Sequence, residues 1–89
     1  MSVYQLYTLF PVEDGIEYAH DGTFATPEAA QRWAAEGLSK DAEGPWRRQT
    51  RIKGRVLQHP RWIRPVPHRR RRGPGWSIGW VVQEDEIQS

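Results

Sequence analysis

Residues 22–38, GTFATPEAAQRWAAEGL, predict the end of a strand that runs into the chain's one clear helix. Thr26 is a suitable N-cap, because its hydroxyl can accept a hydrogen bond from an otherwise unpaired backbone N–H. Pro27 fits the first helical position, where no amide donor is needed. Gly37 is placed to end the helix in a left-handed conformation.

The spacing of this helix predicts which face it buries. Ala30, Trp33 and Ala34 share one face at helical spacing, and Leu38 is expected to fold back across the helix end. We therefore expect Trp33 to fill the space between the helix and a sheet, and a Trp33→Ala change to cost roughly 3–5 kcal/mol of stability.

The residues before the helix predict two strands. Residues 3–10, VYQLYTLF, are rich in β-branched and aromatic residues and are followed by Pro11. Neither alternating face is clearly polar, so this strand is expected near the centre of the sheet. A turn at residues 13–15 then allows residues 16–20 to return as a short antiparallel strand.

Two later segments alternate with a period of two, and each is predicted to be a strand with distinct faces. In residues 46–58 the apolar inner row is Thr50, Ile52, Gly54 and Val56, and the outer row is Arg47, Gln49, Arg51, Lys53 and Arg55. In residues 76–83 the inner row is Trp76, Ile78, Trp80 and Val82, and the outer row is Ser77, Gly79, Val81 and Gln83.

Residues 59–75 lie between these segments and contain four prolines and two glycines. Such a composition opposes regular structure over most of the stretch. A short strand over residues 61–64 with Trp62 turned inward is compatible with it. The remainder predicts a projecting arm rich in proline and arginine at about residues 59–75.

Together these segments predict an α+β fold with one domain over residues 1–89. It consists of a small antiparallel sheet of three to five strands with one helix packed on a face, in the order β-(β)-α-β-(β)-β. The 89-residue chain is 37% hydrophobic and contains five tryptophans, a composition typical of a globular domain. A chain of this size buries only about 60% of its unfolded surface, so large aromatic side chains are needed in its core.

The sequence also predicts a compartment. It contains no cysteine, which fits a reducing environment and excludes disulfides and thiolate metal sites. Its first residues lack the basic and apolar pattern of a signal peptide, and no stretch approaches the roughly 20 apolar residues of a membrane span. We therefore expect a cytoplasmic protein.

The charges are divided sharply along the chain. Residues 1–43 contain eight acids and two bases, a balance of −6, whereas residues 44–83 contain eleven bases and no acid. Residues 84–86 add three acids, which brings the net charge to +2. Such asymmetry predicts the kind of partner rather than the fold.

Clustered bases next to aromatic residues favour nucleic-acid binding, because phosphates attract guanidinium groups and unpaired bases stack on aromatic rings. We expect a small accessory protein that binds DNA or RNA and does not associate with a membrane. Phosphates would be contacted from a basic strand face and from the arm, with Trp62 as the candidate for stacking. The predicted binding residues are Arg47, Arg51, Lys53, Arg55, Arg61, Trp62, Arg64, Arg69, Arg70, Arg71 and Arg72.

Three other interpretations of the same residues remain open. The bases could form only a solvated strand face, or they could be neutralised by the acidic half, within one fold or between copies in a homodimer. The chain could also be a protein-binding regulator or inhibitor that docks on a larger host complex, with the arm and Trp62 as anchors. Residues 22–30 look like a segment that many small bacterial and phage accessory domains carry, which implies no particular activity.

The sequence does not favour an enzyme. His20, His59 and His68 lack metal-ligand spacing, and the acids at residues 13–21 lack the spacing of a calcium loop. No nucleophile accompanies the adjacent pair His20 and Asp21. We therefore expect no catalytic residues, no metal site and no cofactor.

Overall fold

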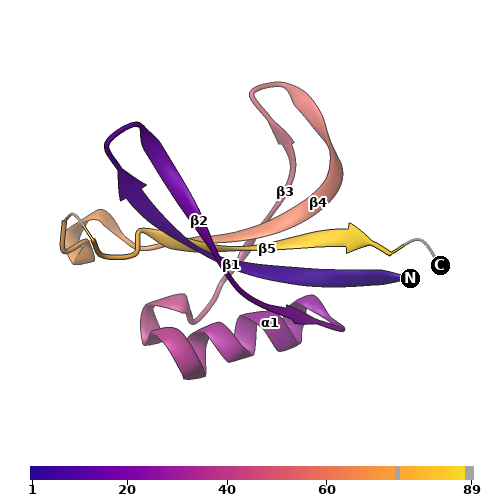
Figure 1. Ribbon diagram of the computed structural model, residues 1–89, viewed down its shortest axis with the longest axis horizontal. Coiled ribbons are helices and arrows are strands. Elements are labelled where there is room, and N and C mark those ends of the chain that lie inside the picture. Colours follow the sequence, from indigo (N-terminus) through magenta and orange to yellow (C-terminus); the bar gives the residue numbers. More distant parts are fainter. Residues whose placement is uncertain (74, 88–89) are drawn as a thin grey trace.

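The computed structural model describes residues 1–73 and 75–87, which form a five-stranded antiparallel sheet with one helix on a face. Hairpin strands β1 (Ser2–Val12) and β2 (Gly15–Phe24) precede helix α1 (Pro27–Trp33). Strands β3 (Arg47–Ile52), β4 (Arg55–Pro65) and β5 (Gly79–Glu86) follow. The order across the sheet is β2-β1-β5-β4-β3, so the last strand lies between the two hairpins (Figure 1).

The predicted sheet with one helix on a face is therefore confirmed. The predicted chain order is matched in part: the helix lies between β2 and β3, and the single strand expected over residues 46–58 is in fact a turn and parts of two strands. Within the described residues, no helix is long and apolar enough to cross a membrane.

The start of the helix follows the prediction and its end does not. The Thr26 side chain accepts a hydrogen bond from the Ala29 N–H at 3.1 Å, and Pro27 occupies the first turn. The prediction of a left-handed cap at Gly37 is wrong, because α1 continues into a π-helical turn, Ala34–Leu38. That turn ends with a hydrogen bond from the Ser39 N–H to the Ala34 carbonyl at 3.0 Å.

The core lies between α1 and the sheet. Ala30 and Ala34 on the helix side are fully buried, and they face Leu6, Trp80 and Val82 of the sheet. Small alanines let the helix approach closely, so the large ring that fills the space comes from the sheet, where Trp80 is 1% exposed.

The expectation that Trp33 fills this space is wrong. Trp33 is 42% exposed and lies beside Phe24, with ring centroids 6.0 Å apart. Leu38, which was expected to cross the helix end, is also exposed. Helical spacing identified the correct side of the helix but not the residue at its centre, because Ala30 and Ala34 occupy the closest line of approach.

A two-residue turn divides the strand that was expected over residues 46–58. Lys53 and Gly54 both have positive φ, at 50° and 79°, which is the backbone of a primed hairpin turn. The expected apolar inner face is also wrong for Val56, which is 70% exposed. The hairpin extends away from α1 (Figure 1), and Val56 lies at the start of β4, next to the turn.

The last strand begins later than expected. β5 starts at Gly79, and Trp76 lies before it in a turn closed by a hydrogen bond from the Trp76 N–H to the Gly73 carbonyl at 3.2 Å. Trp76 was expected to point inward and is instead 53% exposed. The inward positions of Trp80 and Val82 are confirmed, whereas Val81, expected outward, is buried on the other face.

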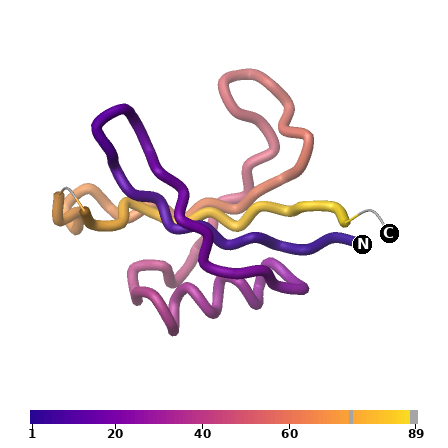
Figure 2. The backbone as a smooth tube through the Cα atoms, viewed as in Figure 1, coloured from indigo at the N-terminus to yellow at the C-terminus, as the bar shows by residue number. Residues whose placement is uncertain are grey.

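That other face of the sheet, opposite α1, is called the open face below. Strand register places on it Tyr7, Leu9, Tyr18, His20, Arg47, Gln49, Arg61, Ile63, Val81 and Gln83. Leu9 and Val81 are buried there, outside the helix-side core. Both hairpin turns point away from the helix, and the backbone tube shows the same course (Figure 2).

Candidate nucleic-acid interface

The β3–β4 hairpin carries four exposed members of the predicted set of binding residues, Arg47, Arg51, Lys53 and Arg55. Arg51, Lys53 and Arg55 surround its turn and are all exposed. Within the described residues the one ion pair joins Arg70 and Asp41, so no carboxylate neutralises these three side chains. We call the exposed bases Arg47, Arg48, Arg51, Lys53 and Arg55 the basic hairpin.

The basic hairpin presents charge on both sides of its ribbon. Arg47 pairs with Ile63, which pairs with Val81, so Arg47 lies on the open face. Gln49 lies on that face too by alternation, and Arg48, which pairs with Trp62, lies on the helix side. The pairing of β3 with β4 shifts register between Gln49 and Arg51, so alternation does not assign a face to Arg51. Arg61 of β4 pairs with Gln49, and its Nε donates a hydrogen bond to the Gln49 Oε1 at 2.8 Å.

Trp62, the predicted stacking residue, lies on the helix side and is packed. Its ring meets Tyr4 edge to face at a centroid distance of 5.9 Å. The guanidinium of Arg48 lies 5.7 Å from its ring centroid. Trp62 also contacts the core cluster, so its ring already has partners within the fold.

The first part of the predicted arm belongs to the sheet. Residues 59–65 lie in β4, and Val66, which follows, is 3% exposed. Pro65 does not interrupt this strand, because it lies at the end of β4 and is the last residue that pairs with β5. The connection that protrudes from the sheet therefore comprises residues 67–77, and one of these, Pro74, lies outside the described residues.

The arginines next to and within this connection are mostly held by the protein itself. Arg64 Nε donates to the Asp41 carbonyl at 3.2 Å, and Arg70 forms the ion pair with the Asp41 carboxylate at 2.7 Å. Arg71 Nε donates to the Val66 carbonyl at 3.0 Å. The Arg72 guanidinium lies 4.9 Å from the ring centroid of Trp76. Arg69 is exposed.

The structure does not bring the two basic groups together. The β3–β4 turn lies at the start of β4 and the connection at its end, and Figure 1 shows them at opposite ends of the sheet. At about 3.3 Å per residue, a strand of this length separates them by roughly 30 Å. Only a ligand that spans this separation could contact both groups at once.

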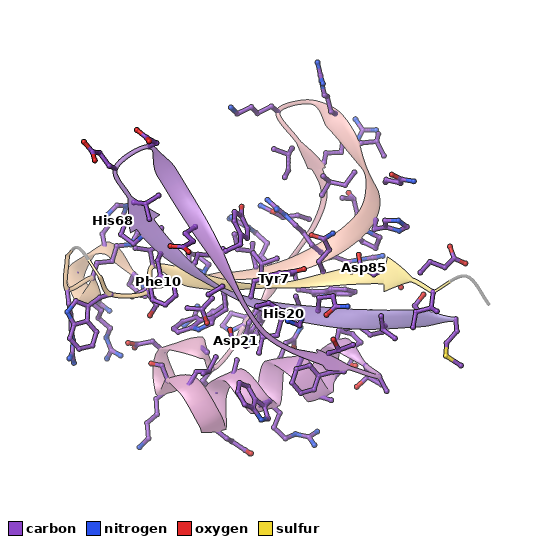
Figure 3. All side chains as sticks on the ribbon, in the orientation of Figure 1. Tyr7, Phe10, His20, Asp21, His68 and Asp85 are labelled. Carbon is purple, nitrogen blue, oxygen red and sulfur yellow. The ribbon has the colours of Figure 1, made fainter. Side chains whose placement is uncertain are left out.

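Sequence reasoning missed an aromatic cluster on the open face, formed by Tyr7, Tyr18 and His20. The ring centroid of Tyr7 lies 6.3 Å from that of Tyr18 and 5.3 Å from that of His20. Figure 3 labels Tyr7 and His20, which lie close together near the middle of the sheet. The available signal was the turn at residues 13–15, because hairpin register from that turn pairs Tyr7 with His20.

Trp76 was also missed as an exposed aromatic. The alternation of residues 76–83 placed it inside, although the glycines at 73 and 75 were a signal for a turn. Both glycines have positive φ, at 95° and 84°.

Acidic groups gather elsewhere. Glu13 and Asp14 form the exposed tip of the β1–β2 hairpin. On the helix side the Tyr4 hydroxyl donates to Glu84 Oε1 at 3.0 Å, and this hydrogen bond, with a smaller contribution from burial, raises the pKa of Tyr4.

The histidines lie on separate elements, and His20 and Asp21 do not act as a pair. His20 Nε2 is 2.6 Å from Gln5 Oε1, whereas Asp21 accepts a hydrogen bond from the Thr8 hydroxyl at 2.5 Å. His59 is in β4 and His68 in the connection. Within the described residues, no three His, Asp or Glu side chains are grouped closely enough to hold a metal ion.

Comparison with known proteins gives no relative: no family model matches the chain, and no curated protein or solved structure is similar to it.

Proposed function

We propose that the protein is a small cytoplasmic accessory protein that binds nucleic acid, DNA or RNA, mainly through the basic hairpin. The observation that supports this best is the exposure of Arg51, Lys53 and Arg55 around one turn, where none of them forms an ion pair with a carboxylate of residues 1–73 or 75–87. Clustered, unpaired bases attract phosphates and release condensed counterions, which favours binding at low salt. The cytoplasmic assignment relies on the absence of cysteine.

The connection at residues 67–77 would make a second, weaker contact. Arg69 is exposed, and Arg72 and Trp76 together present a cation and an aromatic ring at the surface. Arg64, Arg70 and Arg71 mainly shape the connection, because each already bonds to a main-chain or side-chain oxygen. About five exposed bases are then available for phosphates: Arg47, Arg51, Lys53, Arg55 and Arg69.

The test compares a hairpin variant with a variant of equal charge. Arg51→Gln/Arg55→Gln removes two charges from the basic hairpin, and Arg32→Gln/Lys40→Gln removes two exposed charges on the other side of the fold. Binding of a fluorescently labelled 20-nucleotide single strand and of its duplex is measured by anisotropy between 50 and 300 mM salt.

Five phosphate contacts predict a slope of log K against log salt of about −4.5 for the duplex and about −3.5 for the single strand. The hairpin variant should bind more weakly, and its slope should be smaller in magnitude by about 1.4 to 1.8. The control variant should retain the wild-type slope. Binding that does not respond to salt, or equal losses in both variants, contradicts the proposal.

One observation favours the alternative, a protein-binding regulator of the phage accessory type. An apolar depression lies beside the connection, lined by Pro11, Val12, Glu13, Arg71, Gly73 and Ile78. Val12 is 45% exposed and Trp76 is 53% exposed in the same region. Co-purification of one defined acidic protein, lost in Val12→Ser and free of nucleic acid by its ultraviolet absorbance, would support this alternative.

A further inference from the structure

The open face carries two different chemistries on its two halves. The β1–β2 half presents the aromatic cluster Tyr7, Tyr18 and His20. The β3–β4 half presents Arg47, which is exposed, and Arg61, which is half-buried and whose Nε donates a hydrogen bond to Gln49. Proteins bind an unpaired nucleic-acid strand with aromatic rings that stack on its bases and with cationic groups that contact its phosphates. A duplex uses only the cationic groups, because its bases are already stacked on one another.

The aromatic cluster has room for a base. Tyr18 is 49% exposed and His20 is exposed, so both rings reach solvent although their strand belongs to the sheet. Tyr7 and Tyr18 meet at 79°, edge to face, so the two rings do not lie flat on one another. The His20 ring already contacts Tyr7 and is hydrogen-bonded to Gln5, so Tyr18 is the ring of the cluster that is available to a base.

The surface between the two halves carries one acid, because Asp85 lies on the open face of β5, where its carboxylate accepts a hydrogen bond from the Gln83 amide at 3.3 Å. β5 lies in the centre of the sheet, where Val81 is buried and Gln83 is half-buried. At about 4.8 Å between neighbouring strands, β2 is roughly 14 Å from β4, which carries Arg61, and roughly 19 Å from β3, which carries Arg47. A nucleotide and an arginine side chain together can bridge the shorter of these separations, with the sugar lying over β5.

The distribution of charge sets the orientation of such a strand. The acidic tip, Glu13 and Asp14, belongs to the same hairpin as the aromatic cluster and repels phosphates. The basic hairpin attracts them. A duplex has phosphates on both sides, so one of its backbones would face the acids.

We propose that the open face binds single-stranded nucleic acid, with phosphates on the β3–β4 half and a base stacked on Tyr18. This inference rests on the proposed function and adds the class of ligand. Stacking on an aromatic ring is independent of base identity, so the site accepts any sequence.

The test uses three labelled probes of equal length: a 12-nucleotide oligothymidine, a 12-nucleotide strand of abasic sites and a 12-base-pair duplex. The abasic strand keeps the phosphates and lacks the bases. The variants are Tyr18→Leu, which keeps apolar bulk, Tyr18→Phe, which keeps the ring, and Trp33→Leu, which removes an exposed ring on the helix side. Circular dichroism confirms that each variant is folded.

Wild type should bind the oligothymidine at least about fivefold more tightly than the abasic strand, and the two controls, Tyr18→Phe and Trp33→Leu, should keep this preference. Tyr18→Leu should lose most of it. Equal affinity of wild type for both strands, or a preference that survives in folded Tyr18→Leu, overturns the inference. If the open-face inference is overturned in this way but Arg51→Gln/Arg55→Gln still weakens binding, the proposed function stands without the open-face inference. If no probe binds, both fail.

Discussion

Replacement of Trp80 tests whether the core is centred on the sheet rather than on the helix. Trp80 is 1% exposed and contacts the cluster that includes Leu6, Ala30 and Val82. Trp80→Ala removes the largest fully buried side chain and leaves a void that the neighbouring alanines are too small to fill. Trp33→Ala is the matched control, because it removes the same side chain from the helix.

The expected losses follow from the exposures. An indole buries roughly 150 Å² more than the alanine that replaces it, and at about 25 cal/mol per Å² its complete removal from the core costs about 4 kcal/mol. Trp33 is 42% exposed, so only about 90 Å² is lost, which costs about 2 kcal/mol. The Trp80 change should therefore cost about 2 kcal/mol more than the Trp33 change.

Urea unfolding followed by far-ultraviolet circular dichroism measures this difference without relying on tryptophan fluorescence. Both variants are compared with wild type at the same pH and salt, with the free energy of unfolding extrapolated to water. An equal or larger loss for Trp33→Ala would refute this description of the core and restore Trp33 to its centre. A Trp80→Ala protein that is unfolded at 25 °C beside a folded Trp33→Ala protein would support the description.

Two further predictions concern the sheet. The hydrogen bond to Glu84 raises the pKa of Tyr4, so the folded state keeps the phenol proton to higher pH than the unfolded state does. The contribution of this hydrogen bond to the free energy of unfolding is therefore complete below about pH 10, the ordinary pKa of tyrosine, and is lost as pH rises through the folded-state pKa. The stability difference between wild type and Tyr4→Phe should therefore shrink between pH 8 and pH 10.5 in urea titrations, and a constant difference would contradict this. Gly79→Ala places a Cβ 3.0 Å from the Arg64 carbonyl oxygen of the paired strand, so it should cost about 1–3 kcal/mol in thermal unfolding. Gly37→Ala, whose Cβ meets only the Trp33 ring at 3.5 Å, is the control and should be neutral or stabilising.

The parts of the fold that depend on residues close together in the sequence were predictable. Thr26 and Pro27 determine the start of the helix through their own side chains and backbone, and Ala30 and Ala34 identify its buried side by spacing alone. The position of Trp33 was not predictable, because it depends on which sheet residue faces the helix. That residue, Trp80, lies more than forty positions later in the chain.

The hairpin between β3 and β4 was hidden by a regular pattern. Arg51, Lys53 and Arg55 continue the alternation across the turn, so periodicity alone gave one strand through residues that are in fact a turn. Lys53 carries the positive φ that asparagine or aspartate would normally have in such a turn, and Gly54 was the one local indication.

The candidate site was predictable in part for a similar reason. The exposed bases of the hairpin follow from composition and alternation along one segment. The aromatic cluster on the open face depends on the register between β1 and β2, which brings Tyr7 beside Tyr18 and His20 from the other strand. Trp62 was assigned from its charged neighbours, and the side it occupies depends on its pairing with Arg48 and Val82.

The sheet order explains why the division of charge along the chain becomes a division in space. The acidic hairpin β1–β2 and the basic hairpin β3–β4 occupy opposite edges, and β5 enters between them instead of allowing β1 and β4 to pair. Within the described residues the acids and bases meet in one ion pair, between Arg70 and Asp41, and this pair anchors the connection rather than the hairpins. Neutralisation within the described part of the fold therefore accounts for little of the basic charge, because Arg51, Lys53 and Arg55 form no ion pair with a carboxylate there. Their counter-charges must come from solvent ions or from another molecule, and release of those ions by a phosphate backbone is the free-energy source on which the proposed function depends.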